Sequence, residues 1–186
     1  MDSFNPTTKT QAALTAALQA ASAAGNPEIR PAHLLVALLD QTDGIAAPLL
    51  KAVGTDPATV RREAQDIVDR LPRATGATTT PQLGREALAA ITAAQHLATE
   101  LGDEYVSTEH VMVGLASGDS DITMLLEKYG ATAAALREAF TTVRGTARVS
   151  SPDPEGSYQA LEKYSDRKST RQNSSHQVQS RMPSSA

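Results

Sequence analysis

The sequence contains an internal repeat of long period. The segment GNPEIRPAHLLVAL at residues 25–38 returns as GDEYVSTEHVMVGL at residues 102–115, an offset of 77 positions. Further on, LLKAVG at residues 49–54 returns as LLEKYG at residues 125–130, an offset of 76. A period of this kind indicates one supersecondary unit that occurs twice and buries its apolar face against its neighbour. The two copies run from about residue 6 to 71 and from about residue 81 to 143.

Each copy has the boundary signals of four helices. Asn5 before Pro6 is typical of a helix start, and Gly25 of a helix end. The later signals of the first copy are an opening at Pro31, a third helix over about residues 45–53 and a cap at Asp56-Pro57. Those of the second copy are an opening at Thr80-Pro81, a stop at Gly102, a cap at Ser107, a stop at Gly130 and an end near Arg144. We therefore predict an all-α fold of eight helices, arranged as two pseudo-symmetric four-helix repeats.

The chain changes character after the second copy. Residues 150–157 hold two prolines, a glycine and three serines, which is typical of a linker. From residue 166 the chain is rich in Ser, Gln and Arg and has few apolar groups to offset the entropy of ordering. We predict a domain at residues 1–145, a linker at 146–165 and a disordered tail at 166–186 that resembles translated cloning or frameshifted sequence.

Composition excludes several classes of function. A net charge of −4 argues against nucleic acid, and the absence of cysteine excludes thiol chemistry and fits a cytoplasmic protein. No secretory signal, membrane span, phosphate-binding loop, G-x-S-x-G or H-E-x-x-H pattern occurs. Aromatic residues make up 3% of the chain, so the core must be built from Ala, Leu, Val and Ile. We expect no enzyme, no metal, no cofactor and no membrane or nucleic-acid partner.

Two histidines occupy equivalent positions of the repeat. His33 and His110 each fall in the first turn of a second helix, where they suit either acid–base or metal chemistry or a local structural hydrogen bond. Because no ligand partner stands at helical spacing, we favour the structural interpretation. The carboxylate of Glu109 falls in the first turn of its helix, where it interacts favourably with the helix dipole. The first copy has Ala32 at the equivalent position, so a functional role for Glu109 stays open. Asp103 fits a solvated loop residue as well as a binding residue.

The helix at 81–101 suggests a binding surface. Its expected core stripe is Leu88, Ile91, Ala94 and Ala98. At about 100° per residue, Leu97 falls about 240° and Ala93 about 200° from Ile91, on the outer face. An isolated surface leucine is ordinary. The alternative is that Leu97 and Ala93 floor an apolar groove between the repeats.

The repeated motifs resemble a known family. Pro-x-His-Leu-Leu-x-Ala-Leu-Leu from Pro31 and Ser-Thr-Glu-His-Val-x-x-Gly-Leu from Ser107, each after a glycine-terminated helix, look like the Clp amino-terminal repeat domain. The loop at residues 102–110 and SYQALEKY at 157–164 look like the ClpB disaggregases in particular. In that family the latter stretch leads into the first ATPase domain, so the resemblance implies a chain truncated before that domain.

The resemblance implies a function and a site. ClpB-type proteins are ATP- and Mg-dependent hexamers of the stress response that disaggregate proteins with the DnaK chaperone system, and their amino-terminal domain binds unfolded or aggregated clients. Family positions linked to client handling match Thr7, Asp103 and Glu109, and the family's apolar groove matches Ala93, Leu97 and His110. By itself the fragment is expected to be a monomer without catalytic activity or cofactor.

One other function remains in competition at this stage. Related ClpC domains read phosphoarginine with one carboxylate in each repeat, but here only Glu109 is present and Ala32 replaces the other, so that activity is not expected. The chain could also be an adaptor-docking domain of a Clp protease unfoldase, which would bind folded partners. Binding of unfolded against folded ligands discriminates the client-binding from the adaptor-docking hypothesis.

Overall fold

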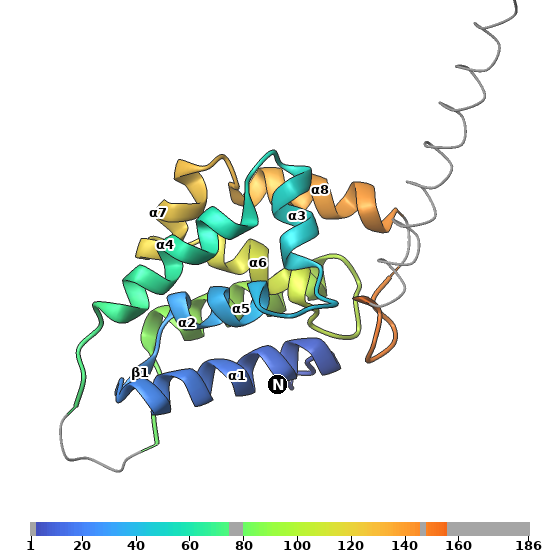
Figure 1. The fold of residues 1–186 in the computed structure, drawn as a ribbon. Helices are drawn as coiled ribbons and strands as arrows, with labels where there is room; N and C mark the ends of the chain where they lie inside the picture. The colour runs from blue at the N-terminus through green and yellow to red at the C-terminus, as the bar shows by residue number, and fades with distance from the viewer. Residues whose placement is uncertain (1–2, 75–79, 146–147, 156–186) are drawn as a thin grey trace, which may run out of the picture.

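The computed structural model describes residues 3–74, 80–145 and 148–155 and is mainly helical there (Figure 1). The predicted linker residues 156–165 and tail 166–186 lie outside the described residues. Eight helices and two short strands follow one another in the order α1 (Thr8–Ala24), β1 (Glu28–Ile29), α2 (Pro31–Leu39), α3 (Ala46–Ala52), α4 (Pro57–Asp69), β2 (Gln82–Leu83), α5 (Arg85–Glu100), α6 (Thr108–Ala116), α7 (Asp121–Lys128) and α8 (Ala133–Arg144). The all-α prediction of two four-helix repeats is confirmed.

Most helix boundaries follow the sequence signals. The side chain of Asp56 caps α4, and Ser107 is the N-cap residue of α6. Gly25 ends α1 in the left-handed conformation that glycine adopts at low cost. The predicted starts of the two long helices were wrong. Helix α1 begins after Thr7, whose hydroxyl accepts from the Thr10 N–H, and α5 begins after Gly84.

The start of each long helix is displaced because the preceding residues pair with the other repeat. Strands β1 and β2 are parallel, and the Gly84 N–H donates to the Ile29 carbonyl at 3.0 Å. A bridge joins Pro6 to Val106, and the Thr7 N–H donates to the Val106 carbonyl at 3.0 Å. Moving each residue of the first contact into the other repeat by the offset of 77, from 84 to 7 and from 29 to 106, gives the second contact. The two halves therefore hold each other by reciprocal, pseudo-symmetric backbone pairings that the sequence patterns did not indicate.

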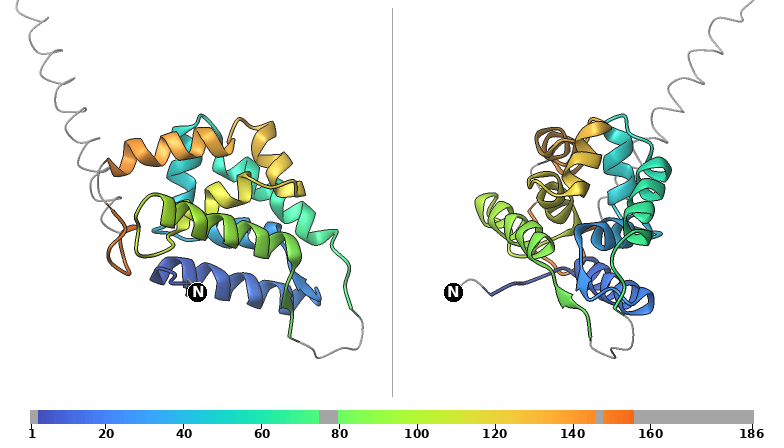
Figure 2. Two further views of the ribbon diagram at one scale, coloured as in Figure 1. Left: turned by 180° about the vertical axis from the view of Figure 1, so that it is seen from behind. Right: turned by 90° about the vertical axis from the view of Figure 1, so that its left-hand side faces the viewer.

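The core fills the space between the two repeats. In Figure 1, α1 runs along one edge and α8 along the opposite one, with α2, α5 and α6 between them; Figure 2 shows the same layers from behind and from the side. The largest fully buried side chains include Leu34, Leu49, Met112, Leu126 and Phe140. Helices α1 and α5 instead bury mainly alanines, which lets helices approach one another closely, as the aromatic-poor composition predicts.

The buried face of α5 differs from the predicted one. Leu97 is 6% exposed, whereas Leu88, placed in the expected core stripe, is 51% exposed. The buried set is Ala87, Ala90, Ile91, Ala94, Leu97 and Ala98. Those residues span an arc of about 120° that starts at Ile91 and ends at Leu97. The expectation that Leu97 lies on the outer face was therefore wrong, because a large aliphatic residue, Leu88, was given more weight than the alanines that make the contact.

Helices α5 and α6 pack too closely for a side chain at Gly114. A Cβ atom there would lie 2.2 Å from the backbone oxygen of Ala90. We expect Gly114→Ala to lower the free energy of unfolding by about 1–3 kcal/mol, because the helices must move apart. The equivalent residue of the first repeat is Ala37, so Ala37→Gly is the matched control and should cost no more than about 1 kcal/mol. Denaturant titration of both variants checks this, and equal stability of Gly114→Ala and wild type would contradict the close approach.

Candidate functional site

The two repeated histidines hold their own loops in place. The Arg30 N–H donates to His33 Nδ1 at 2.8 Å, and the Ser107 N–H donates to His110 Nδ1 at 2.9 Å. Since Nδ1 accepts in both rings, the proton is on Nε2. In His33 this Nε2 donates to Asn26 Oδ1 at 3.0 Å. Each imidazole therefore bridges the start of its helix to the loop before it, which matches the structural interpretation of both residues.

The second repeat replaces the neutral partner by a carboxylate. His110 Nε2 donates to Asp103 Oδ2 at 2.8 Å, and Asp103 is also paired with both guanidinium NH groups of Arg144. A third donor is the Val149 N–H, 2.9 Å from Asp103 Oδ1. The Asp103 side chain is fully buried, so it is a structural anchor and not the solvated loop residue that its position favoured.

The environment of Asp103 favours its ionised form. Burial raises the pKa of this carboxyl, but the hydrogen bonds from His110, Arg144 and Val149 and the charge of Arg144 outweigh burial and lower the pKa to about 2. In the first repeat the residue equivalent to Asp103 is the neutral Asn26, whose side-chain amide donates to the Pro72 carbonyl. There, burial lowers the pKa of His33, and the charge of Arg30 lowers it further. The sequence analysis missed Asn26 and Arg144. An Asn or Asp seven residues before each histidine was a signal for Asn26, whereas no such pattern marked Arg144.

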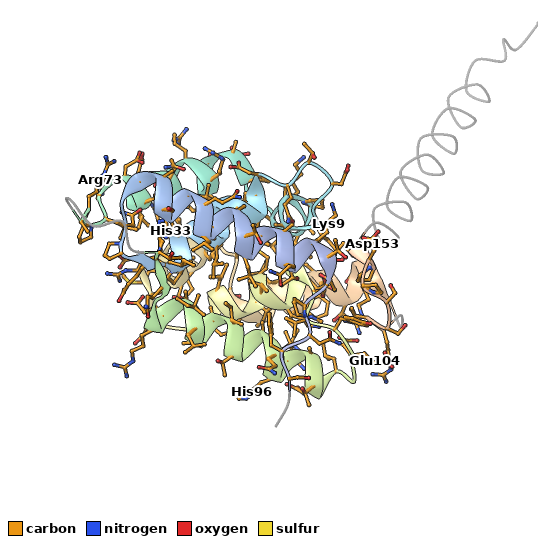
Figure 3. The ribbon with its side chains drawn as sticks, turned by 90° about the horizontal axis from the view of Figure 1, so that it is seen from below. Lys9, His33, Arg73, His96, Glu104 and Asp153 are labelled. Carbon is orange, nitrogen blue, oxygen red and sulfur yellow. The ribbon has the colours of Figure 1, made fainter. Side chains whose placement is uncertain are left out.

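Residues 148–155, which we call the strap, fold back over the starts of α1 and α6. Val149 and Glu155 are fully buried, so the packed part of the chain extends past residue 145, where the sequence analysis ended the domain. The Thr7 hydroxyl donates to Glu155 Oε1 at 2.8 Å, and the Thr108 N–H donates to the same oxygen at 3.2 Å. Figure 3, which labels Asp153 and Lys9, shows the strap at the beginning of α1. No sequence pattern pointed to Glu155, since it lies in a Pro- and Ser-rich segment.

Glu109 is a buried acid without a partner. Its side chain is inaccessible, and neither carboxylate oxygen has a hydrogen-bond partner in the described part of the chain. Burial raises the pKa of Glu109, and the nearby carboxylate of Glu155 raises it further, whereas His110 and Ser107 lower it. An acid in this position is costly to ionise. Glu109 is therefore not accessible to a ligand from the surface in this structure.

Four of the six predicted site residues gather at the start of α6. These are Thr7, Asp103, Glu109 and His110, all with buried side chains. In this structure these side chains are therefore not open to a ligand at the surface. Ala93, which is half-buried, lies elsewhere on α5 and lines a groove that none of these four residues lines. Leu97 belongs to the core.

The groove at Ala93 has a smaller counterpart in the first repeat. The second-repeat groove has a volume of about 590 Å³ between α5, α6 and α7, and its walls include Ala89, Ala93, Gly114 and Gly118. The first-repeat groove has a volume of about 390 Å³ between α1, α2 and α4, and its walls include Ala12, Ala16, Ala37 and Gln41. Each residue of the second set is related to one of the first set by the offset of 77. The fold therefore presents one small-residue groove on each repeat.

The described residues offer no other functional chemistry. Among them no cluster of three or more His, Cys, Asp or Glu residues could hold a metal ion. A search of the same residues finds no helix long and apolar enough to cross a membrane. Candidate ligand sites are the pair of grooves and a third cavity of about 300 Å³, which is lined by residues such as Asn5, Gln95 and Glu104.

Curated proteins of high similarity are chaperones. The chain is 77% identical over 165 residues to the chaperone protein ClpB of Mycobacterium tuberculosis (strain ATCC 25618 / H37Rv), a match that covers 89% of this chain and 20% of that protein. It is 60% identical over 166 residues to the chaperone protein ClpB of Corynebacterium glutamicum, again over 89% of this chain and 20% of that protein. The chain thus spans about a fifth of the length of these relatives.

Solved structures share the fold at low identity. The Hsp104 N-terminal domain from Candida albicans superposes with a TM-score of 0.71 at 18% identity, over 81% of this chain and 99% of that one. The N-domain of ClpV from Vibrio cholerae gives a TM-score of 0.63 at 18% identity, over 74% of this chain and 84% of that one. The family model for the Clp repeat (R) N-terminal domain, a non-catalytic module, matches residues 5–129. The chain therefore belongs to the family of Clp repeat N-terminal domains.

Proposed function

We propose that this chain is the client-binding module of an ATP-dependent disaggregase chaperone, and that it holds unfolded or aggregated polypeptide in the second-repeat groove. The observation that supports the proposal is the groove itself. It is open, its walls combine Ala and Gly with polar residues such as Arg85 and Asp119, and it contains Ala93, one of the positions that match the family's apolar groove. The similarity to ClpB chaperones supports the class of ligand.

The chemistry of the groove suits an extended apolar segment. Small wall residues leave room for the large side chains that an unfolded client exposes. Arg85 lines the groove at the start of α5 and Asp119 lines it near the start of α7, and neither forms an ion pair within the described ranges. They supply polar contacts at the edges for the client backbone. Affinity should therefore depend chiefly on the apolar contact and only weakly on salt.

The remaining steps belong to the intact chaperone. We propose that ATP and Mg act in its ATPase domains, that those domains assemble the hexamer, and that the DnaK system cooperates with it in the cytoplasm. The share of the ClpB relatives that this chain does not cover leaves room for these activities. The module itself needs only to bind and release.

A charge placed in the groove tests the proposal. We expect Ala93→Asp to weaken binding of a denatured test protein at least about tenfold, because a carboxylate in an apolar contact must be desolvated without a partner. Ala16→Asp puts the same charge at the equivalent position of the first-repeat groove and is the matched control for helix propensity and net charge. Fluorescence anisotropy with a labelled, unfolded client measures both affinities.

The outcomes separate the competing functions. Loss of binding in Ala93→Asp alone assigns the client to the second-repeat groove. Loss in Ala16→Asp alone would move the client to the first-repeat groove and contradict the assignment. Binding of folded but not of unfolded ligands to the wild type would favour the adaptor-docking function instead.

A further inference from the structure

The strap is attached to the domain through a few contacts at its two ends. At one end the Val149 carbonyl accepts from the Glu104 N–H at 2.9 Å, and the Val149 N–H donates to Asp103. At the other end Glu155 accepts from Thr7 and Thr108, and between them the Pro152 carbonyl accepts from the Thr8 N–H at 2.8 Å. The middle residues, 150–153, are exposed. Such a segment can open without disturbing the helices beneath it.

Glu155 makes favourable hydrogen bonds at its end of the strap, but it also lies near the buried carboxyl group of Glu109. One carboxylate oxygen of Glu155 faces the N-termini of α1 and α6, where partial positive charge and free N–H groups stabilise an anion. Within the described ranges, the second oxygen, Oε2, is buried without a hydrogen-bond partner, and so are both oxygens of Glu109. Two acids thus lie close together in a site with little water, and they cannot both ionise cheaply.

We infer that residues 148–155 form a releasable strap that Glu155 holds against α1 and α6, and that the charge on Glu109 beneath it sets the balance between the held and the released state. The charged groups that face Glu109 are Glu155 from the strap and His110 from its own helix, with the Asp103–Arg144 pair behind His110. A held strap buries Thr7 and Glu109. A client could contact Thr7 or Glu109 only after the strap is released. This last step rests on the proposed function.

The sign of the charge effect follows from burial. Because burial and Glu155 raise the pKa of Glu109, its neutral form favours the held state. The stabilisation of that state is complete below the ordinary pKa of a glutamic acid and declines as pH rises through the raised value. Raising the pH should therefore loosen the strap, and a neutral residue at position 109 should remove this dependence.

Amide hydrogen exchange on the full chain tests the strap directly. The reporters are the N–H groups of Thr8 and Glu104, because each donates to a backbone carbonyl of the strap. We expect Glu155→Ala to lower the protection of both about tenfold or more, while the Asn26 N–H, bonded within the first repeat, is unaffected. Asp153→Ala, which removes an exposed carboxylate from the same segment, is the control and should leave all three unchanged.

A second variant tests the charge on Glu109. At a pH above the raised pKa of Glu109 we expect higher protection of Thr8 and Glu104 in Glu109→Gln than in wild type. As the pH falls and Glu109 takes up its proton, the wild-type protection, corrected for intrinsic exchange, should rise, and that of Glu109→Gln should stay level. Unchanged protection in Glu155→Ala, or an equal loss at Asn26, would overturn the releasable strap. The same pH slope in Glu109→Gln and wild type would overturn the role of Glu109. Neither result depends on client binding.

Discussion

Asp103→Asn is expected to lower the free energy of unfolding by about 3–5 kcal/mol, because it removes the negative charge of Asp103 from beside the buried guanidinium of Arg144. The Arg144 side chain is 7% exposed and forms an ion pair with Asp103. The new amide can still accept from His110, as Asn26 accepts from His33 in the first repeat. The other carboxylate oxygen, which accepts from Arg144 and Val149, becomes a donor group, so the loss combines the charge with these hydrogen bonds. Urea unfolding monitored by circular dichroism measures it.

The first repeat supplies the compensating change. Its residue equivalent to Arg144, at the offset of 76, is the buried Val68. The double variant Asp103→Asn, Arg144→Val recreates that neutral arrangement, so it should regain most of the lost stability, since replacing a buried ion pair by apolar groups is often nearly neutral. A double variant as unstable as the single one would contradict the assignment of the cost to Arg144.

The pH dependence of the same variant gives an independent check. The pKa of Asp103 is lowered from 3.8 to about 2 in the folded chain, so its contribution is complete above pH 3.8 and is lost as the pH falls toward 2. The difference in stability between wild type and Asp103→Asn should therefore be constant near neutral pH and shrink below about pH 4. A difference that stays constant down to pH 2 would show that charge is not its source.

Leu97→Ala should lower the free energy of unfolding by about 2–5 kcal/mol, as the truncation of a buried leucine does. Leu97 is 6% exposed and belongs to the main core. Leu88→Ala removes the same atoms from the same helix at a site that is 51% exposed, and it should change stability by no more than about 0.5 kcal/mol. The paired unfolding curves decide between the two faces of α5. A larger loss of stability in Leu88→Ala than in Leu97→Ala would show that the face predicted from the sequence is the buried one.

Local signals predicted the fold because they act over short distances and occur in both repeats. Caps and stops such as Asp56, Ser107 and Gly25 act within one helical turn, so they can be recognised without knowledge of the partner surface. The face of α5 was misjudged because hydrophobic patterning gives weight to size, whereas the close contact with α6 selects small residues such as Ala90 and Gly114.

The site was predicted less well because its contacts are distant along the chain. Thr7 meets Glu155 across 148 positions, and Asp103 meets Arg144 across 41. The resemblance to the Clp family singled out Thr7, Asp103, Glu109 and His110, and the structure brings these four together. Their burial under the strap depends on residues that no periodic pattern marks. The role of the six residues in client binding stays a prediction.

The most direct test of client binding is to map it on the wild-type chain by NMR. A denatured, isotope-unlabelled client is titrated into the labelled chain, and the backbone amide shifts are followed. We predict that the shifts concentrate on the walls of the second-repeat groove, at Ala89, Ala93, Ser117 and Gly118, with little change at Ala12 and Ala16 of the first-repeat groove. Shifts confined to the first-repeat groove, or no saturable shifts with any unfolded client, would contradict the account.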